Sequence, residues 1–301
     1  MKKIIVRVRG GLGNQLFIIG YAMYIQSLFE DAMLICDCRE YDYYKIRKYE
    51  LSNLKVEDEL AQYKKSDDKS NLKYEIAMKL LHFRMFILQK LGLPFIDNSV
   101  WEELFNVIYN TADINKKKIK KENIYLYGYF VNVKPLLKIR ERLVATMEVK
   151  SVSSLMAAYI NDVSQTKHSV AISMRFGQDY IANKWPICSL EYYDTAMNQF
   201  NDQDTVFFVF SDEIEQAKEY FRGRNNIRYV ENCSPCEQMS IMKQCDDFII
   251  SNSTFSWWGA FLGKKDDRII YAPEIWHDKK TKDSRFFFEN IRVISSAGEL
   301  L

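Results

Sequence analysis

The regular alternation of strand and helix signals in the C-terminal half restricts the fold of this chain more than any other feature. Short apolar segments rich in valine, isoleucine or phenylalanine are typical of buried parallel strands. They occur at Ser169–Met174, Thr205–Phe210, Ile227–Val230, Asp247–Ser251 and Arg268–Ala272. Helical patterns fill the gaps between them, at Leu190–Phe200, Glu213–Phe221, Pro235–Gln244 and Thr254–Leu262. This order predicts a doubly wound parallel sheet, which binds ligands at the carboxyl ends of its strands.

The N-terminal half begins with the same alternation. A strand at Lys3–Arg9 leads through a glycine turn into a helix that ends near Glu30, and a second strand follows at Ala32–Cys36. Further on, the patterns predict a helix at about Tyr74–Leu91, a strand at Asn123–Phe130 and a helix at Lys134–Met147. We therefore predict an α/β fold with two Rossmann-like lobes, residues 1–150 and 151–301, with the linker at Lys150–Ser154.

Charge and hydropathy exclude several classes of function. Lys plus Arg (42) nearly balances Asp plus Glu (40), so the chain has no global field that would attract nucleic acid. The one dense basic run, Lys116–Lys121, is either a solvated loop or a contact with an anionic membrane face. No segment approaches the ~18 apolar residues that cross a bilayer, and the N-terminal apolar stretch is too short for a signal peptide. We expect a cytoplasmic protein, free or peripheral at the inner face of the membrane.

The six cysteines are too few and too scattered for a disulfide framework. Cys233 and Cys236 have zinc-knuckle spacing, but no second such pair follows, and none of the three histidines lies at ligand spacing from them. We therefore expect reduced thiols and no metal site.

The glycine-rich segment Gly10–Phe17 joins the first strand to the first helix. Gly11 and Gly13 would let a ligand approach the backbone, and the helix start favours an anion. The side-chain amides of Asn14 and Gln15 could bond a phosphate or a sugar hydroxyl without adding charge. The alternative is a purely structural turn, because the segment is neither a P-loop nor a complete dinucleotide fingerprint.

Two further segments follow strands of the C-terminal half. Arg175 is placed to bind a diphosphate, and Asp179 could take a proton from an incoming hydroxyl; the alternative is a surface ion pair. Asp212 ends the next strand, either as a plain N-cap or as a group that holds a nucleoside hydroxyl.

The segment that contains Ser253, Thr254 and Phe255 opens a helix, where small hydroxyls can cap the helix or add donors to a bound phosphate. The following pair Trp257-Trp258 indicates core packing rather than a stacking platform. A further helix start is marked by a capping box, with Ser234 as N-cap, Pro235 at the first position and Glu237 completing the box.

These segments resemble glycosyltransferase family 11, the alpha-(1,2)-fucosyltransferases of bacterial type. The most specific matches are Gly10–Phe17 and Ser251–Gly259, and they appear in the family's order across nearly the whole chain. The resemblance is also carried by Arg175–Tyr180, Phe210–Asp212, Gly128–Phe130 and Ala272–Trp276.

The resemblance implies a GT-B-like fold, with the acceptor on the N-terminal lobe and GDP-fucose on the C-terminal lobe. It implies transfer of L-fucose to the 2-hydroxyl of a galactoside, in an oligosaccharide or glycolipid, with inversion and without a required metal or other cofactor. Arg175 would bind the β-phosphate, and Asn14 would lie near the donor phosphate or reacting centre. The remaining donor-binding positions implied are Gly11, Gly13, Gln15, Asp212, Glu237, Ser253, Thr254 and Phe255.

The arginine segment departs from the family pattern of His, any residue, Arg, Arg, Gly, Asp. This chain has Ser173 in place of the histidine, Phe176 in place of the second arginine, and an extra Gln178 before Asp179. Asp179 is the first choice for the general base, followed by Glu237 and Asp212. The altered motif leaves open a catalytically impaired sugar-nucleotide-binding or scaffold protein. A nicotinamide-dependent oxidoreductase, with Asp37 on the ribose, is a further alternative.

Overall fold

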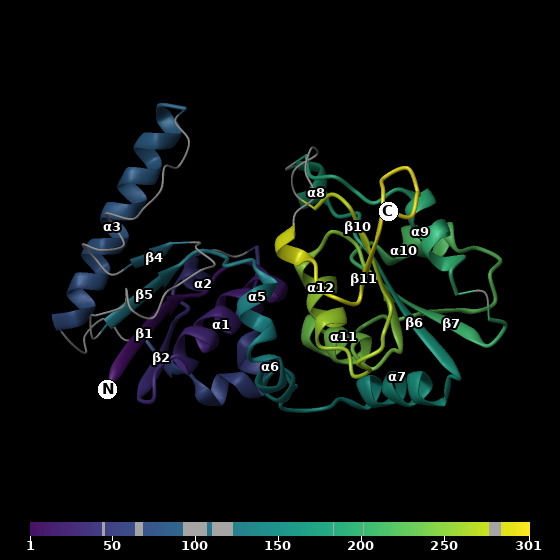
Figure 1. Ribbon diagram of the computed structural model, residues 1–301, viewed down its shortest axis with the longest axis horizontal. Helices are drawn as coiled ribbons and strands as arrows, with labels where there is room; N and C mark the ends of the chain where they lie inside the picture. The colour runs from purple at the N-terminus through teal and green to yellow at the C-terminus, as the bar shows by residue number, and fades with distance from the viewer. Residues whose placement is uncertain are drawn as a thin grey trace. The chain divides into compact units, whose positions relative to one another are not determined.

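The computed structural model describes residues 1–43, 46–63, 69–92, 107–109, 123–182, 184–200, 202–276 and 284–301 (Figure 1). The chain forms two compact units, and each is described by itself. The N-terminal unit consists of residues 1–10, 15–49 and 57–139. The C-terminal unit consists of residues 11–14, 50–56 and 140–301, so part of the glycine segment belongs with the second unit.

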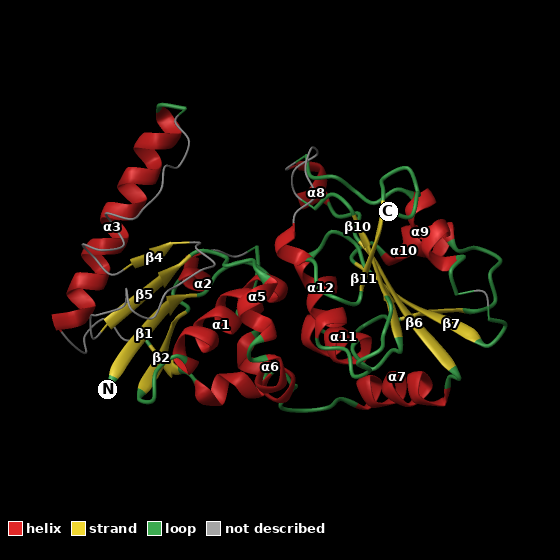
Figure 2. Ribbon diagram, viewed as in Figure 1, coloured by secondary structure: helices red, strands yellow, loops and turns green. Residues whose placement is uncertain are grey.

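The N-terminal unit contains a parallel sheet in the order β3-β2-β1-β5-β4 (Figure 2). Its central strand β1 (Lys2–Arg7) is flanked by β2 (Ala32–Asp37) and β5 (Asn123–Tyr127), and the outer strands are β3 (Ala61–Gln62) and β4 (Val107–Tyr109). Ile4, Ile5 and Val6 are fully buried, because β1 lies in the middle of the sheet. The helices are α1 (Leu12–Ser27), α2 (Glu40–Tyr43), α3 (Lys69–Lys90) and α5 (Val133–Leu137).

The C-terminal unit contains a parallel sheet in the order β11-β10-β9-β6-β7-β8. Read from β8 to β11, with β6 counted as the first strand, this is the order 3-2-1-4-5-6 of a doubly wound Rossmann sheet. Its strands are β6 (His168–Met174), β7 (Thr205–Ser211), β8 (Ile227–Tyr229), β9 (Asp247–Ile249), β10 (Ile270–Pro273) and β11 (Ile291–Ile294). Its helices are α6 (Arg140–Thr146), α7 (Ser154–Gln165), α8 (Gln178–Ala182), α9 (Leu190–Met197), α10 (Ile214–Tyr220), α11 (Pro235–Met242) and α12 (Thr254–Phe261). The predicted α/β fold is confirmed in both parallel sheets, and the C-terminal half contains the predicted doubly wound sheet.

Most predicted elements are present with bounds shifted by a few residues, but two predictions were wrong in detail. The helix predicted at Lys134–Met147 is two helices, α5 and α6, because the amides of Lys138 and Ile139 turn back to carbonyls three residues earlier and close the first helix. The strand predicted to continue to Phe130 ends at Tyr127, since Gly128 (φ 144°) and Phe130 (φ 49°) leave the extended conformation. The domain boundary predicted at residue 150 falls within the C-terminal unit.

The tryptophan pair belongs to the core of the second unit. Trp257 and Trp258 are both 0% exposed, and the indole nitrogen of Trp257 donates to the carbonyl of Phe286 at 2.7 Å. The ring of Trp257 also stacks on Phe261, with centroids 4.7 Å apart. The prediction of core packing is therefore confirmed. Among the helices that the structure describes, none has the length and apolar character needed to cross a bilayer.

Candidate functional site

The strand order of the C-terminal sheet reverses between β6 and β9. At such a reversal the following loops diverge to opposite faces and leave a crevice at the carboxyl ends of the strands. Arg175 follows β6, Asp212 follows the neighbouring strand β7, and the Ser253-Thr254 start of α12 follows β9. Three sequence-predicted segments are thus brought to one edge of one sheet, although up to 79 positions separate them along the chain.

Asp212 holds the segment that follows β6. Its carboxylate pairs with Nη1 of Arg175 at 2.9 Å and accepts hydrogen bonds from the backbone amides of Phe176 (3.0 Å) and Gly177 (2.9 Å). The side chains of Arg175 and Asp212 are each 20% exposed, so the pair is only partly open to solvent. The plain N-cap alternative for Asp212 is wrong, because Glu213 occupies that position of α10.

Arg175 is oriented from two sides. Its guanidinium carbon lies 5.2 Å from the centroid of the Tyr180 ring, and the Tyr180 hydroxyl donates to the carbonyl of Asn252 at 2.8 Å. Tyr180 therefore links the Arg175 loop to the segment that starts α12. Asp179 lies in the short helix α8, but its side chain is outside the described residues, and its role as base stays a prediction.

Gly13 contacts the backbone at the start of α12. A Cβ atom at position 13 would lie 2.5 Å from the amide nitrogen of Phe255 and 2.5 Å from the carbonyl carbon of Thr254. No side chain could give way there, so only glycine fits. The glycine permits close approach, as the sequence suggested, but in this structure the approaching group is another helix start. Next to it, the Thr254 hydroxyl donates to the side-chain oxygen of Asn14 at 3.0 Å.

Gln15 stabilises the glycine turn from inside. Its side chain is 0% exposed, and its amide nitrogen donates to the carbonyls of Gly10 (2.9 Å) and Lys48 (2.7 Å). The hydroxyl of Tyr41 donates to the same Gly10 carbonyl at 2.8 Å. Gly10 itself has φ 78°, a conformation that favours glycine. This structural role was missed in the sequence, where Gln15 resembled a ligand; its donor-binding role stays a prediction.

The helix α12 is electrostatically arranged to favour an anion at its start. Ser253 caps it by accepting from the amide of Phe255. At the opposite end, Arg268 donates to the carbonyls of Ala260 and Phe261, and Arg140 donates to the carbonyls of Phe261 and Gly263. Burial, followed by the nearby charge of Arg140, lowers the pKa of Arg268 to about 10. Two cations satisfy the carboxyl end of the helix, while its amino end faces Asn14.

Glu237 completes the predicted capping box, which is confirmed. One carboxylate oxygen accepts from the backbone amide of Ser234 at 2.8 Å, and the other accepts from the hydroxyl of Ser153. These hydrogen bonds, that of Ser153 foremost, lower the pKa of Glu237. Both oxygens therefore have structural partners, and a donor-binding or base role for Glu237 stays a prediction.

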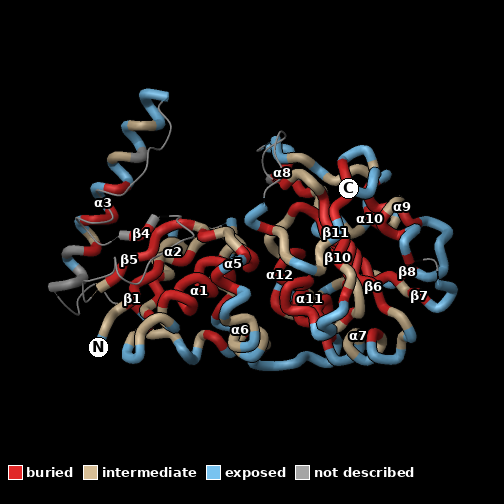
Figure 3. The backbone as a smooth tube through the Cα atoms, viewed as in Figure 1, coloured by how far each residue is buried: buried red, intermediate tan, exposed pale blue. Residues whose placement is uncertain are grey.

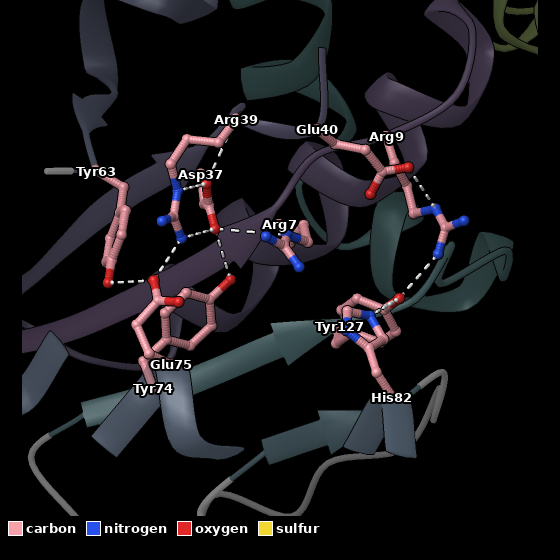
Figure 4. Close-up of polar contacts among 10 residues, drawn as sticks. All are labelled: Arg7, Arg9, Asp37, Arg39, Glu40, Tyr63, Tyr74, Glu75, His82 and Tyr127. Atoms are coloured by element: carbon pink, nitrogen blue, oxygen red, sulfur yellow. Dashed lines mark hydrogen bonds and ion pairs between the residues drawn. The ribbon is translucent and has the colours of Figure 1, made fainter. Parts of the chain in front are cut away.

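A polar network lies at the carboxyl edge of the N-terminal sheet (Figure 4). Asp37 is 0% exposed and accepts from Nε and Nη2 of Arg39 (2.8 and 2.9 Å) and from the Tyr74 hydroxyl (2.9 Å). Arg7 approaches Asp37 at 3.5 Å, and Arg39 also bonds Glu75 at 2.6 Å. Since its oxygens face these groups inside the protein, Asp37 is not presented to a ribose, and the oxidoreductase alternative loses its support.

A second chain of hydrogen bonds runs beside this network. Nη1 of Arg9 donates to the Tyr127 oxygen at 3.0 Å, and the same Tyr127 hydroxyl forms a hydrogen bond of 2.8 Å with Nε2 of His82. Burial, followed by the charges of Arg7 and Arg9, lowers the pKa of His82. No local sequence pattern indicates this group, because Arg9 follows β1, His82 lies in α3 and Tyr127 ends β5.

The chain is similar to known proteins over most of its length. The model of Glycosyl transferase family 11 matches residues 3–291. An alpha-1,2-colitosyltransferase of Escherichia coli is 28% identical over 297 residues, covering 94% of this chain and 96% of the relative. The O-antigen biosynthesis glycosyltransferase WbnK of Escherichia coli is 27% identical over 296 residues, covering 89% and 92%.

Two solved structures that are similar to this chain share little sequence with it. Escherichia coli ADP-heptose lps heptosyltransferase II has a TM-score of 0.48 at 12% identity and covers 97% of this chain and 90% of that one. NodZ alpha-1,6-fucosyltransferase, co-crystallized with GDP, has a TM-score of 0.48 at 11% identity and covers 86% and 91%.

Proposed function

Because this chain belongs to glycosyltransferase family 11, we propose that it transfers L-fucose from GDP-fucose to the 2-hydroxyl of a galactoside. The proposal is supported by the position of Arg175 and the start of α12 on either side of the strand reversal between β6 and β9. A guanidinium and a helix amino end at such a crevice suit a diphosphate. We propose that the donor binds to the C-terminal unit and the acceptor to the N-terminal unit.

The reaction breaks the bond between the anomeric carbon and the β-phosphate oxygen, and GDP leaves with the electron pair. The acceptor oxygen bonds to the anomeric carbon from the opposite face and gives its proton to a carboxylate. Arg175 and the α12 amino end stabilise the charge that develops on the departing diphosphate. We propose that this field suffices without a metal ion, as the family resemblance implies.

Asp179 remains our first choice for the base. Glu237 accepts hydrogen bonds from Ser234 and Ser153, and Asp212 is engaged by Arg175 and two backbone amides. The hydrogen bonds to Glu237 lower its pKa and make it a weaker proton acceptor. The Asp212 carboxylate already holds Arg175 and the two amides of the following loop. Asp212 is better suited to hold Arg175 toward the donor. Asn14, with its side-chain oxygen bonded by Thr254, would present its amide nitrogen to the donor.

The colitosyl relative supports a second donor. Its name specifies an alpha-1,2 linkage with a colitosyl group, and it is similar to this chain over almost the whole length. A nucleotide-linked colitose is therefore the competing substrate. The acceptor would in either case meet the N-terminal unit, where the Arg9–Tyr127–His82 chain offers polar groups at the carboxyl edge of the sheet.

The test is GDP release from GDP-fucose with and without a galactoside, followed by linkage analysis of the product. Arg175→Ala should lower turnover ~100-fold or more, because it removes a charged contact with the leaving group. Arg224→Ala is the matched control, since Arg224 forms a more exposed arginine–aspartate pair with Asp194 in the same unit. Near-normal turnover by Arg175→Ala would refute the assigned role. Turnover with a nucleotide-linked colitose but not with GDP-fucose would make the colitosyl compound the donor. Binding of a donor without turnover would favour the catalytically impaired alternative.

A further inference from the structure

The helix α3 presents apolar side chains on two sides. One side packs on the N-terminal sheet through Tyr74, Ala77, Met78 and Leu81, each at most 5% exposed. These positions recur every three or four residues and therefore define one face of the helix. An ordinary surface helix would be polar on its other side.

The other side of α3 is instead an exposed apolar stripe. It consists of Leu72, Ile76, Leu80, Phe83 and Ile87, which follow one another at spacings of four, four, three and four residues. Their exposed fractions are 63%, 45%, 37%, 63% and 38%. With 3.6 residues per turn, they lie opposite the buried face. Phe86, at the edge of the stripe, is 57% exposed. Figure 3 shows the outer part of α3 largely in the colours of exposed and intermediate residues.

The charge of α3 is strongly positive. The helix contains five basic residues and one acidic residue, Glu75, which gives +4, whereas the whole chain carries only +2. Glu75 points inward and is bonded by Arg39 and by the Tyr63 hydroxyl. Lys79 and Lys90 border the stripe, and Nζ of Lys90 lies 5.6 Å from the centroid of the Phe86 ring. The exposed apolar side chains are thus bordered by cations.

We propose that the stripe of α3 docks on an anionic phospholipid surface, with the helix lying in the interface. Apolar side chains would enter the boundary between head groups and acyl chains, and lysines at its margins would meet the lipid phosphates. Charge complementarity selects this occupant over a second copy of the chain, because two helices of +4 placed face to face would repel each other. The inference does not depend on the proposed sugar transfer.

The test uses the full chain and vesicle flotation without substrate. Vesicles of phosphatidylcholine alone are compared with vesicles that contain about 30% phosphatidylglycerol, at low and high salt. The protein should float with the anionic vesicles only, and less so at high salt. Phe83→Ser combined with Phe86→Ser should weaken this binding at least about tenfold, as should Lys79→Glu combined with Lys90→Glu.

Val152→Ser combined with Leu155→Ser is the matched control, since it removes exposed apolar side chains from the other unit, 58% and 39% exposed, and should leave flotation unchanged. Circular dichroism checks that each variant is folded. Absence of flotation, or equal flotation of all the folded variants, would overturn the proposal. A dimer in light scattering that the Phe83/Phe86 variant abolishes, without vesicle binding, would assign the stripe to a second copy instead.

Discussion

The hydroxyl of Thr254 donates a hydrogen bond to the side-chain oxygen of Asn14 at 3.0 Å, across 240 positions of sequence. Both residues belong to the C-terminal unit, Asn14 in the first residues of α1 that are part of that unit and Thr254 at the start of α12. The bond turns the amide oxygen of Asn14 toward Thr254, so the amide nitrogen is the atom that remains for a ligand.

Thr254→Val should weaken donor use while leaving the fold intact. Valine has nearly the shape of threonine but cannot donate, so the Asn14 amide loses its orientation. We expect kcat with GDP-fucose to fall roughly tenfold, and Thr254→Ser to restore most of it because the hydroxyl returns. Steady-state GDP release measures both. Equal activity of the valine and wild-type proteins would show that this hydrogen bond does not orient a functional group.

Gly13→Ala should be costly although the change is only one methyl group. The new Cβ would meet backbone atoms of Thr254 and Phe255 at 2.5 Å, and backbone cannot rotate away. We expect a loss of about 1–3 kcal/mol in the free energy of unfolding and a large loss of turnover. Gly223→Ala provides the comparison, because no atom lies within 4 Å of its added Cβ, although its φ of 84° adds backbone strain. Urea unfolding compares the stabilities of the two variants, and GDP release should show the Gly223 variant fully active despite that strain.

Asp212→Asn should lower turnover by disordering the Arg175 loop. An amide keeps the size of the carboxylate but loses the charge that pairs with Arg175 and one of the two acceptors for the Phe176 and Gly177 amides. We expect kcat to drop roughly tenfold or more, with a smaller change in KM for the acceptor. The surface change Asp194→Asn, which breaks the Arg224 pair, should have no such effect. An unchanged kcat in Asp212→Asn would mean that Arg175 is positioned by other contacts.

Asp37→Asn should destabilise the protein and reduce its sensitivity to acid. Burial alone would raise the pKa of Asp37, but hydrogen bonds from Arg39 and the charges of Arg7 and Arg39 outweigh burial and lower it below the ordinary 3.8. The stabilisation is therefore fully present above about pH 4 and is lost as the pH falls through the lower pKa of the folded state. Removing the charge deprives the largely buried Arg7 of the Asp37 carboxylate and leaves Arg39 with Glu75, which should cost about 3 kcal/mol at pH 7.

Urea unfolding at pH 7 and below pH 4 measures this difference. The difference between wild-type and Asp37→Asn should shrink in acid, because the wild-type carboxylate also becomes neutral there. Asp31→Asn is the control, since the Asp31 side chain is 73% exposed, and it should change stability by no more than about 0.5 kcal/mol at either pH. A constant difference at both pH values would contradict the assigned pKa direction.

Local sequence determined the elements of this protein and much of their chemistry. Apolar runs such as Thr205–Phe210 predicted strands, since a buried parallel strand must be apolar on both faces. The Ser234–Glu237 capping box predicted a helix start to the residue, because its hydrogen bonds span only three positions. The alternation of these elements was enough to predict a doubly wound sheet, and with it the edge of the sheet at which Arg175 and Ser253 both lie.

Tertiary structure alone decided what several candidate residues do. Gln15 and Asp212 were predicted to bind the donor, which stays a prediction, and in the structure their side chains also hold the glycine turn and the Arg175 loop. Gly13 faces the start of α12, from a part of the chain more than two hundred residues away. The same side chain can bind a substrate or brace a loop, and the choice depends on which distant groups the fold brings within hydrogen-bond distance. That information is not contained in any local pattern.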